Sequence, residues 1–265
     1  MIREKLFNKG QMRDHTFKWR CHEILRIEAF SDAVLAFAVT LTVISLEVPE
    51  TLKELLHSMI GMIGFAICFT FLIMIWVQQY KFFRYFGLHD NQVIFYNSAL
   101  LFTVLFYVYP LKFLFNMLIT GNEFEHNGRL VERVTSIDDL RTLMIIYGVG
   151  FIALYCIFFL MFNHVKKKKD EINLSPIELF HLDSEQIQNV IFIVIGIVSV
   201  IMAALLPANF IGFSGIIYAS ISPVLFIHFS MRGKKMRNTF QFEEIQNHIE
   251  EVKKSKRIKE VEFKD

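Results

Sequence analysis

Three polar residues stand at the start of a long apolar run: Arg26, Ser31 and Asp32. The run itself continues to Leu46. An ionisable side chain at or inside a bilayer costs about 2.5 to 3.5 kcal/mol on insertion scales. Asp32 therefore needs a buried partner or a water-filled cavity, and residues of this kind mark ion paths and proton relays. These properties make Asp32 a candidate functional residue.

Beyond Asp32 the run carries no charge, and its side chains sort into two stripes of helical spacing. Bulky residues form one stripe: Val34, Phe37, Leu41 and Ile44. Small residues form the neighbouring stripe: Ala33, Ala36 and Thr40. Small residues let membrane helices approach closely, so the pattern taken alone favours helix packing. Arg26 and Asp32 lie about 120° apart on such a helix, so we expect each to bond to a residue of another helix and not to the other.

The elements that position these residues are predicted to be six membrane-spanning helices. Apolar residues make up 54% of the chain, with 29 phenylalanines, and they gather in runs near the roughly 20 residues needed to cross a bilayer. Each run must be helical because lipid cannot satisfy backbone polar groups. The predicted spans are residues 27–47, 57–80, 92–119, 142–163, 187–206 and 210–231. The sequence therefore predicts an all-α, polytopic membrane protein.

Basic residues concentrate in the segments expected on one side of the membrane. Residues 1–25 are rich in Lys and Arg, residues 166–169 are four lysines, and the opposite connections are poorer in bases. The positive-inside rule then places both termini in the cytoplasm of a cell-membrane protein. We expect a basic N-terminal segment at 1–25, a six-helix domain at 26–231 and a charged tail at 232–265. The bases should attract anionic lipid headgroups, and nothing points to nucleic acid.

The connection between the fourth and fifth spans, residues 166–186, is predicted to be a charged linker. Ser175, which precedes a proline, and Asp183 can each start a short helix within it. The three cysteines form no C-x-x-C pair and are interpreted as packing residues. The chain contains no H-E-x-x-H, G-x-S-x-G or Gly-rich phosphate loop, and its nine histidines are scattered. We therefore expect no enzyme activity and no bound cofactor or metal.

The run R-x-x-x-F-S-D, formed by Arg26, Phe30, Ser31 and Asp32, is followed by a threonine eight residues after the aspartate. It resembles the first-helix signature of the potassium-channel family typified by the endosomal and lysosomal transmembrane protein 175. Further matching features are a tryptophan late in the second span, and an asparagine and a later proline in the third: Trp76, Asn97 and Pro110. The resemblance covers roughly residues 20–230 and extends to prokaryotic members of the family.

This resemblance implies a homotetramer in which four copies of the first helix line a central pore for potassium ions. No carbonyl filter is implied, and the chain has no T-V-G-Y-G sequence. The matching positions are Phe37 for the constriction, Thr40 for a hydroxyl ring, and Leu41 and Ile44 for further apolar rings. Such a constriction gates by dewetting and prefers the cation that loses water most easily. The implied function is a potassium-preferring cation channel of modest selectivity.

The resemblance also implies a polar network at the inner pore end, made by Arg26, Ser31 and Asp32 of the motif and by Trp76. We interpret these residues, with Phe30, as structural supports rather than ion ligands. Two positions depart from the family pattern: Gln79 stands where many relatives have a histidine, and Phe37 replaces an isoleucine or leucine. An ion-coupled secondary transporter that uses Asp32 as its coupling carboxylate is the alternative. The absence of an internal repeat weighs mildly against it.

Overall fold

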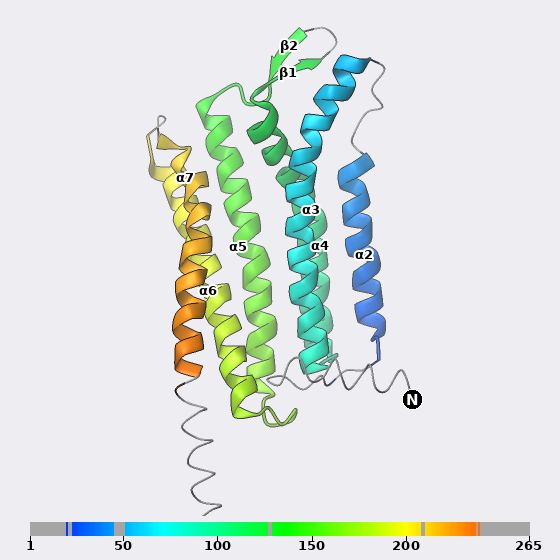
Figure 1. Ribbon diagram of the computed structural model, residues 1–265, viewed down its shortest axis with the longest axis vertical. Coiled ribbons are helices and arrows are strands. Elements are labelled where there is room, and N and C mark those ends of the chain that lie inside the picture. Colours follow the sequence, from blue (N-terminus) through cyan, green and yellow to red (C-terminus); the bar gives the residue numbers. More distant parts are fainter. Residues whose placement is uncertain are drawn as a thin grey trace, which may run out of the picture. The chain divides into compact units, whose positions relative to one another are not determined.

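The computed structural model describes residues 20, 23–44, 51–126, 129–207, 210–236 and 238. The chain folds as two compact units, Met1–Ala219 and Ser220–Asp265. Five long helices run alongside one another in the first unit (Figure 1). They are α2 (Arg26–Ile44), α3 (Leu52–Phe86), α4 (Asn91–Thr120), α5 (Ile137–Lys167) and α6 (Pro176–Leu205). The shorter α7 (Phe213–Ile216) and the 3₁₀-helix η2 (Ile217–Ser220) follow.

The helices are long and apolar enough to cross a membrane. Among the described residues, five segments meet that requirement: Met62–Phe86, Asn91–Met117, Ile137–Lys167, Pro176–Leu205 and Phe213–Met236. The first helix, α2, has 19 residues, which corresponds to about 28 Å of helix and so to most of a bilayer core. The predicted helical membrane fold is confirmed, apart from the short β hairpin described below; five of the six predicted spans meet the requirement among the described residues, and the remaining one is α2. Most of the helices extend beyond the predicted spans, because hydropathy locates the lipid-embedded part and not the helix ends.

The prediction of a charged linker with short helices between α5 and α6 is wrong, because α6 begins within the predicted linker. Ser175 does start a helix, through a capping box in which its side chain and that of Glu178 each bond to the other residue's backbone N–H. That helix is α6 itself, which continues without a break, so Asp183 lies inside it. Lys166 of α5 forms an ion pair with Asp183 at 2.6 Å. The second half of the predicted linker, residues 176–186, thus forms the first turns of a membrane helix.

A short hairpin that the sequence analysis did not anticipate lies between α4 and α5. Strand β1 (Glu123–His126) pairs in antiparallel register with β2 (Arg129–Glu132), with Glu123 opposite Glu132. Residues 127 and 128 lie outside the described part of the chain. The hairpin marks one end of the first unit, here called the hairpin end. The other end, called the basic end, carries the connections 87–90 and 168–175.

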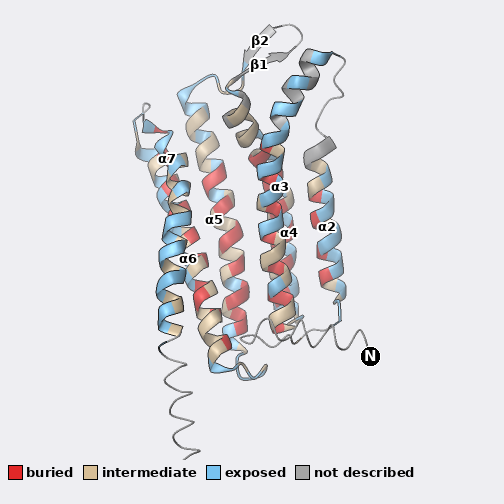
Figure 2. Ribbon diagram, viewed as in Figure 1, coloured by how far each residue is buried: buried red, intermediate tan, exposed pale blue. Residues whose placement is uncertain are grey.

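Glycine permits the closest contacts among α4, α5 and α6. A Cβ atom on Gly150 would lie 2.3 Å from the ring of Tyr107, and one on Gly148 would lie 2.3 Å from Val200. The first helix is joined less fully: α2 packs on α3 and α4, and exposed residues run along much of its length (Figure 2). The core of the first unit therefore sits among α3 to α6, and α2 is applied to one side of it.

The second unit begins within the last helical run. That run, Phe213–Met236, corresponds to the predicted sixth span at 210–231. Five of its large apolar residues within the second unit are exposed: Val224, Phe226, Ile227, Phe229 and Met231. The tail predicted at 232–265 lies outside the described residues except for its first few positions, and so does most of the N-terminal segment at 1–25.

Candidate functional site

The first helix has two different faces. The buried face consists of Glu28, Ser31, Leu35 and Ala38, which recur at spacings of three and four and pack on α3 and α4. The opposite face is exposed and carries Phe30, Ala33, Phe37 and Thr40 at the same spacing. We call this second set the outward face of α2. The positions suggested for a constriction and a hydroxyl ring thus lie on the side of α2 turned away from its own bundle.

The predicted constriction residues occupy this face to different degrees. The Phe37 side chain is 55% exposed, and Thr40 lies one turn further along the helix. The Thr40 hydroxyl donates a hydrogen bond to the Phe37 carbonyl oxygen at 2.7 Å. Leu41 is half-buried at the border of the face. Ile44 ends α2, and its side chain lies outside the described part.

A buried chain of three polar side chains fixes α2 to its neighbours. The Asn97 amide of α4 donates to Ser31 Oγ at 2.8 Å, and Ser31 Oγ–H donates to the Ile27 carbonyl at 2.7 Å. The Gln79 amide of α3 donates to Asn97 Oδ1. All three side chains are at most 2% exposed. Sequence reasoning noted Asn97 and Gln79 only for their match or mismatch to a family pattern; the usable signal was that amides inside apolar spans need partners.

Asp32 follows Ser31 in the sequence, but it lies on the exposed side of α2, outside the buried hydrogen-bonded network. Its Oδ1 accepts a hydrogen bond of 2.7 Å from Trp76 Nε1 of α3. Trp76 stacks on Tyr80 at 5.6 Å between ring centroids, and the guanidinium of Arg84 lies 5.3 Å from the centre of the Tyr80 ring. These contacts join the carboxylate of α2 to a row of side chains one turn apart along α3.

The charged tie between α2 and α3 uses Glu28 and not Arg26. Arg26 is exposed and has no recorded partner within the part of the chain that the structure describes. Glu28 is 4% exposed and pairs with Arg84 Nε at 3.2 Å. Phe30 is 62% exposed. Sequence reasoning missed Glu28, although an acidic residue in the first turn of a helix is a recognisable stabilising feature.

A second ionic cluster at the basic end joins α4 to α5. Asp90 caps α4 by accepting from the Val93 N–H at 3.0 Å. His164 Nε2 and Lys168 Nζ lie 2.7 Å and 2.9 Å from Asp90 Oδ2. Burial would raise the pKa of Asp90, but the hydrogen bonds from Lys168, Val93 and His164 outweigh it and hold that pKa well below its usual range. The hydrogen bond to Asp90 raises the pKa of Lys168.

The described residues include no group of three or more His, Cys, Asp or Glu side chains placed to hold a metal ion. What the site offers instead is a helix face with one aromatic ring and one hydroxyl, held in place by polar contacts on its other side.

Comparison with known proteins identifies relatives over nearly the whole chain. The model of the family described as endosomal/lysosomal potassium channel TMEM175 matches residues 26–107. A potassium channel of Marivirga tractuosa is 38% identical over 232 residues, covering 85% of this chain and 94% of that protein. A potassium channel of Chamaesiphon minutus is 31% identical over 102 residues, covering 36% of this chain and 50% of that protein.

Solved structures agree with the observed fold. The crystal structure of the potassium channel MtTMEM175 T38A variant, in complex with a nanobody–MBP fusion protein, superposes with a TM-score of 0.70. It is 36% identical and covers 82% of this chain and 97% of that one. A lysosomal potassium-selective channel homologue from Chamaesiphon minutus, at 22% identity, a TM-score of 0.50 and coverage of 78% and 96%, shares the fold. The chain belongs to the TMEM175 family of potassium channels, which is not a family of enzymes.

Proposed function

We propose that the protein is a potassium-preferring cation channel in which four copies of the chain meet along the outward face of α2. The observation that carries this proposal is the exposure of Phe37 and Thr40 on the side of α2 opposite its buried face. The potassium-channel relatives support the ion. A four-fold axis along that face would surround one narrow passage with four phenyl rings and four hydroxyl groups.

The chemistry of the outward face argues against plain contact with lipid. Asp32 is exposed beside this face, near the start of α2, and a carboxylate in contact with hydrocarbon is costly. Ala33 and Ala36 are also exposed, and small residues permit the close approach of neighbouring helices. A passage containing water would relieve the cost at Asp32, and close packing around an axis would use the alanines.

The proposed selectivity follows from the two side chains at the passage. Phenyl rings cannot replace the water around an ion, so a ring of Phe37 side chains gates by dewetting and favours the more weakly hydrated potassium over sodium. The Thr40 hydroxyl already donates its proton to the Phe37 carbonyl. Its oxygen lone pairs therefore stay available to a cation. Leu41 and Ile44 would add apolar rings beyond it.

The remaining assignments complete this proposal. Arg26, Phe30, Ser31, Asp32 and Trp76 would support the inner end of the passage without binding the ion. The contacts of Ser31 with Asn97 and of Asp32 with Trp76 support that role. The basic end would face the cytoplasm with both termini, in a cell membrane whose anionic lipids contact its lysines. No cofactor is proposed; potassium is the permeant ion.

Purified protein in planar bilayers under a potassium-to-sodium gradient tests the function. We expect unitary currents whose reversal potential lies toward that of potassium. Thr40→Val should lower the potassium-to-sodium permeability ratio about threefold, since it removes the ring of hydroxyl groups next to the Phe37 constriction. Thr70→Val is the matched control, because Thr70 is also exposed and also bonds back to its own helix, at the Ala66 carbonyl.

Two results would contradict the proposal. Saturable flux without unitary events would favour a transporter that uses Asp32, an alternative that the channel relatives do not favour. An equal loss of selectivity in the Thr40 and Thr70 variants would mean that the Thr40 hydroxyl groups do not line the passage.

A further inference from the structure

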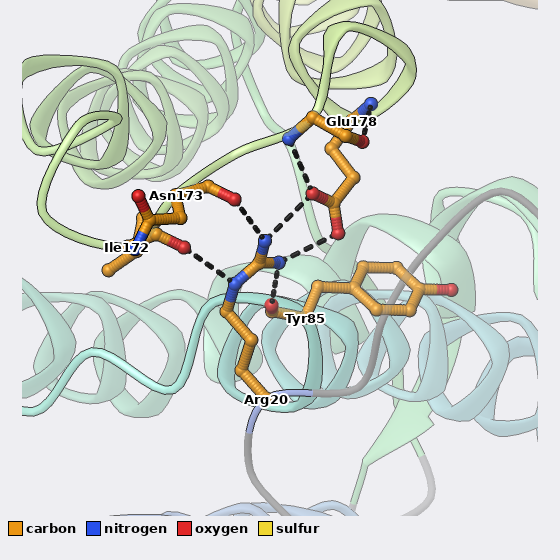
Figure 3. A network of polar contacts seen from close by, with 6 residues as sticks. Arg20, Tyr85, Ile172, Asn173 and Glu178 are labelled. Carbon is orange, nitrogen blue, oxygen red and sulfur yellow. Dashed lines mark hydrogen bonds and ion pairs between the residues drawn. The ribbon is translucent and has the colours of Figure 1, made fainter.

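Arg20, which precedes α2, makes polar contacts with several segments that are distant from it in the sequence (Figure 3). Its guanidinium forms a two-pronged contact with Glu178 at the start of α6, at 2.8 Å to Oε1 and 2.7 Å to Oε2. It also donates to three carbonyl oxygens: Tyr85 at 3.1 Å, Ile172 at 3.1 Å and Asn173 at 3.2 Å. These acceptors come from the end of α3, the α5–α6 connection and α6.

The number and geometry of these bonds require an arginine. A guanidinium has five N–H donors in a fixed planar fork, and the five contacts of Arg20 use all of them. The Arg20 and Glu178 side chains are only 18% and 3% exposed, so water does not compete freely for the pair. A lysine would keep the charge but could not hold the two carboxylate oxygens and the three carbonyls together.

The contacts of Arg20 continue to α2 through α3. The Arg20 backbone N–H donates to the Arg84 carbonyl at 3.1 Å, and the Arg84 side chain pairs with Glu28 of α2. We call Arg20, Glu28, Arg84 and Glu178 the clamp. At the basic end it joins the first turn of α6, the last turn of α3 and the first turn of α2 by two charged pairs and by the backbone hydrogen bond between Arg20 and Arg84.

We propose that Arg20 is a positioning residue for conduction: it fixes the start of α2 to the α5–α6 connection, so that movements of that connection reach the pore-lining helix. This role rests on the proposed channel function. It differs from that of the outward face, because the clamp touches neither Phe37 nor Thr40. The clamp should therefore control how long a conducting state lasts and leave ion selection unchanged.

Hydrogen–deuterium exchange on the purified full-length protein tests the mechanical part without any current. Arg20→Gln and Arg20→Lys should both raise exchange in two separate segments, residues 23–30 and 168–176, while leaving α4 unchanged. Lys167→Gln is the matched control, since Lys167 is an exposed base near the same connection. If the Arg20 variants change exchange in only one segment or in neither, the coupling is absent and the proposal fails, whether or not the protein conducts.

Single-channel recording tests the functional part. Both Arg20 variants should shorten the mean open time about fivefold. The weakened clamp restrains the start of α2 less, which lowers the barrier to leaving the conducting state. The unitary conductance and the reversal potential should stay at wild-type values. The charge swap Arg20→Glu with Glu178→Arg should not restore the open time, because glutamate cannot donate to the three carbonyls. Open times within twofold of wild type in both variants, or a shifted reversal potential, would overturn the proposal; absence of current in the wild type would instead refute the channel function.

Discussion

Phe37 exposes more than half of its side chain although it stands in the middle of an apolar helix. If four such rings narrow the passage, Phe37→Ala should raise the unitary conductance several-fold and lower potassium selectivity. A wider opening keeps more of the hydration shell around either ion, so the difference in dehydration cost between them shrinks. The measurement is single-channel conductance and reversal potential in planar bilayers.

Phe102→Ala is the control for this substitution, because Phe102 lies on α4 and is 71% exposed. It makes the same change in side-chain volume away from α2. A similar rise in conductance in both variants would mean that Phe37 does not narrow the passage.

At the scale of single residues, sequence reasoning found the residues of α2 but not all of their partners. Asp32 attracted notice as a charge near the membrane, and its contact with Trp76 was named only through a family resemblance. The hydrogen bond between Gln79 and Asn97 could not be derived, because the sequence does not say at what height two helices pack against each other. Glu28 was overlooked since an acid near a helix start has an ordinary role in soluble proteins too.

At the scale of elements, Asn97 holds three helices together. Asn97→Ala would leave Ser31 and Gln79 buried without this partner. The average cost of such a loss in a membrane is about 0.6 kcal/mol per bond, so we expect a loss of about 1 kcal/mol from the free energy of unfolding. Unfolding in mixed detergent micelles, followed by circular dichroism, measures it.

Ser98→Ala is the neighbouring control, since Ser98 is exposed and its hydroxyl donates to the Ile94 carbonyl oxygen of its own helix. It should be close to neutral. Equal stability of the Asn97 variant and the wild type would show that the buried chain does not hold α2 in place.

Asp90 combines a helix cap with an ionic contact, and two substitutions separate these roles. Asp90→Asn keeps a good cap but loses the charge; Asp90→Ala loses both and should be less stable than Asp90→Asn by about 1 kcal/mol. Because the pKa of Asp90 is lowered in the folded state, the charge contributes stability above about pH 4, near the unfolded pKa of aspartate. That contribution is lost as the pH falls toward the lowered folded pKa.

Thermal unfolding in detergent as a function of pH checks this behaviour. The difference between wild type and Asp90→Asn should shrink as the pH falls below about 4. Above about pH 10 it should shrink again as Lys168, whose pKa is raised, loses its proton. A difference that grows as the pH falls below about 4 would contradict the assignment.

The helices illustrate what hydropathy can and cannot predict. The run of apolar residues located every long helix, but α6 begins at Pro176 rather than at residue 187 because Ser175 and Glu178 form a capping box. Hydropathy does not predict the hairpin between α4 and α5; the signal for it is the dipeptide Asn127-Gly128, which separates its two four-residue strands in the sequence. Local capping and short-range pairing decide these boundaries, and hydropathy does not report them.

At the scale of the whole molecule, the packing of α2 on α3 and α4 of the same chain accounts for its buried face. It does not account for the residues on the outward face. The sequence could predict an amphipathic division of the helix only in part, because nearly all of its side chains are apolar or hydroxylic. The assembly of four copies enters through the family resemblance and not through periodicity. If four copies met at an axis along α2, then Phe37, Thr40 and the exposed alanines would all face the other copies of this helix.

The most direct test of that axis is cadmium block of Thr40→Cys in a background without the native cysteines. Four thiolates around one axis form a soft-ligand site that binds cadmium tightly. Single-channel potassium currents of this variant should be blocked by micromolar cadmium and recover on chelation, whereas Ser98→Cys on the exposed side of α4 should conduct unaffected. Currents that persist through Thr40→Cys in cadmium, or an equal block of the Ser98 variant, would contradict a potassium path lined by α2.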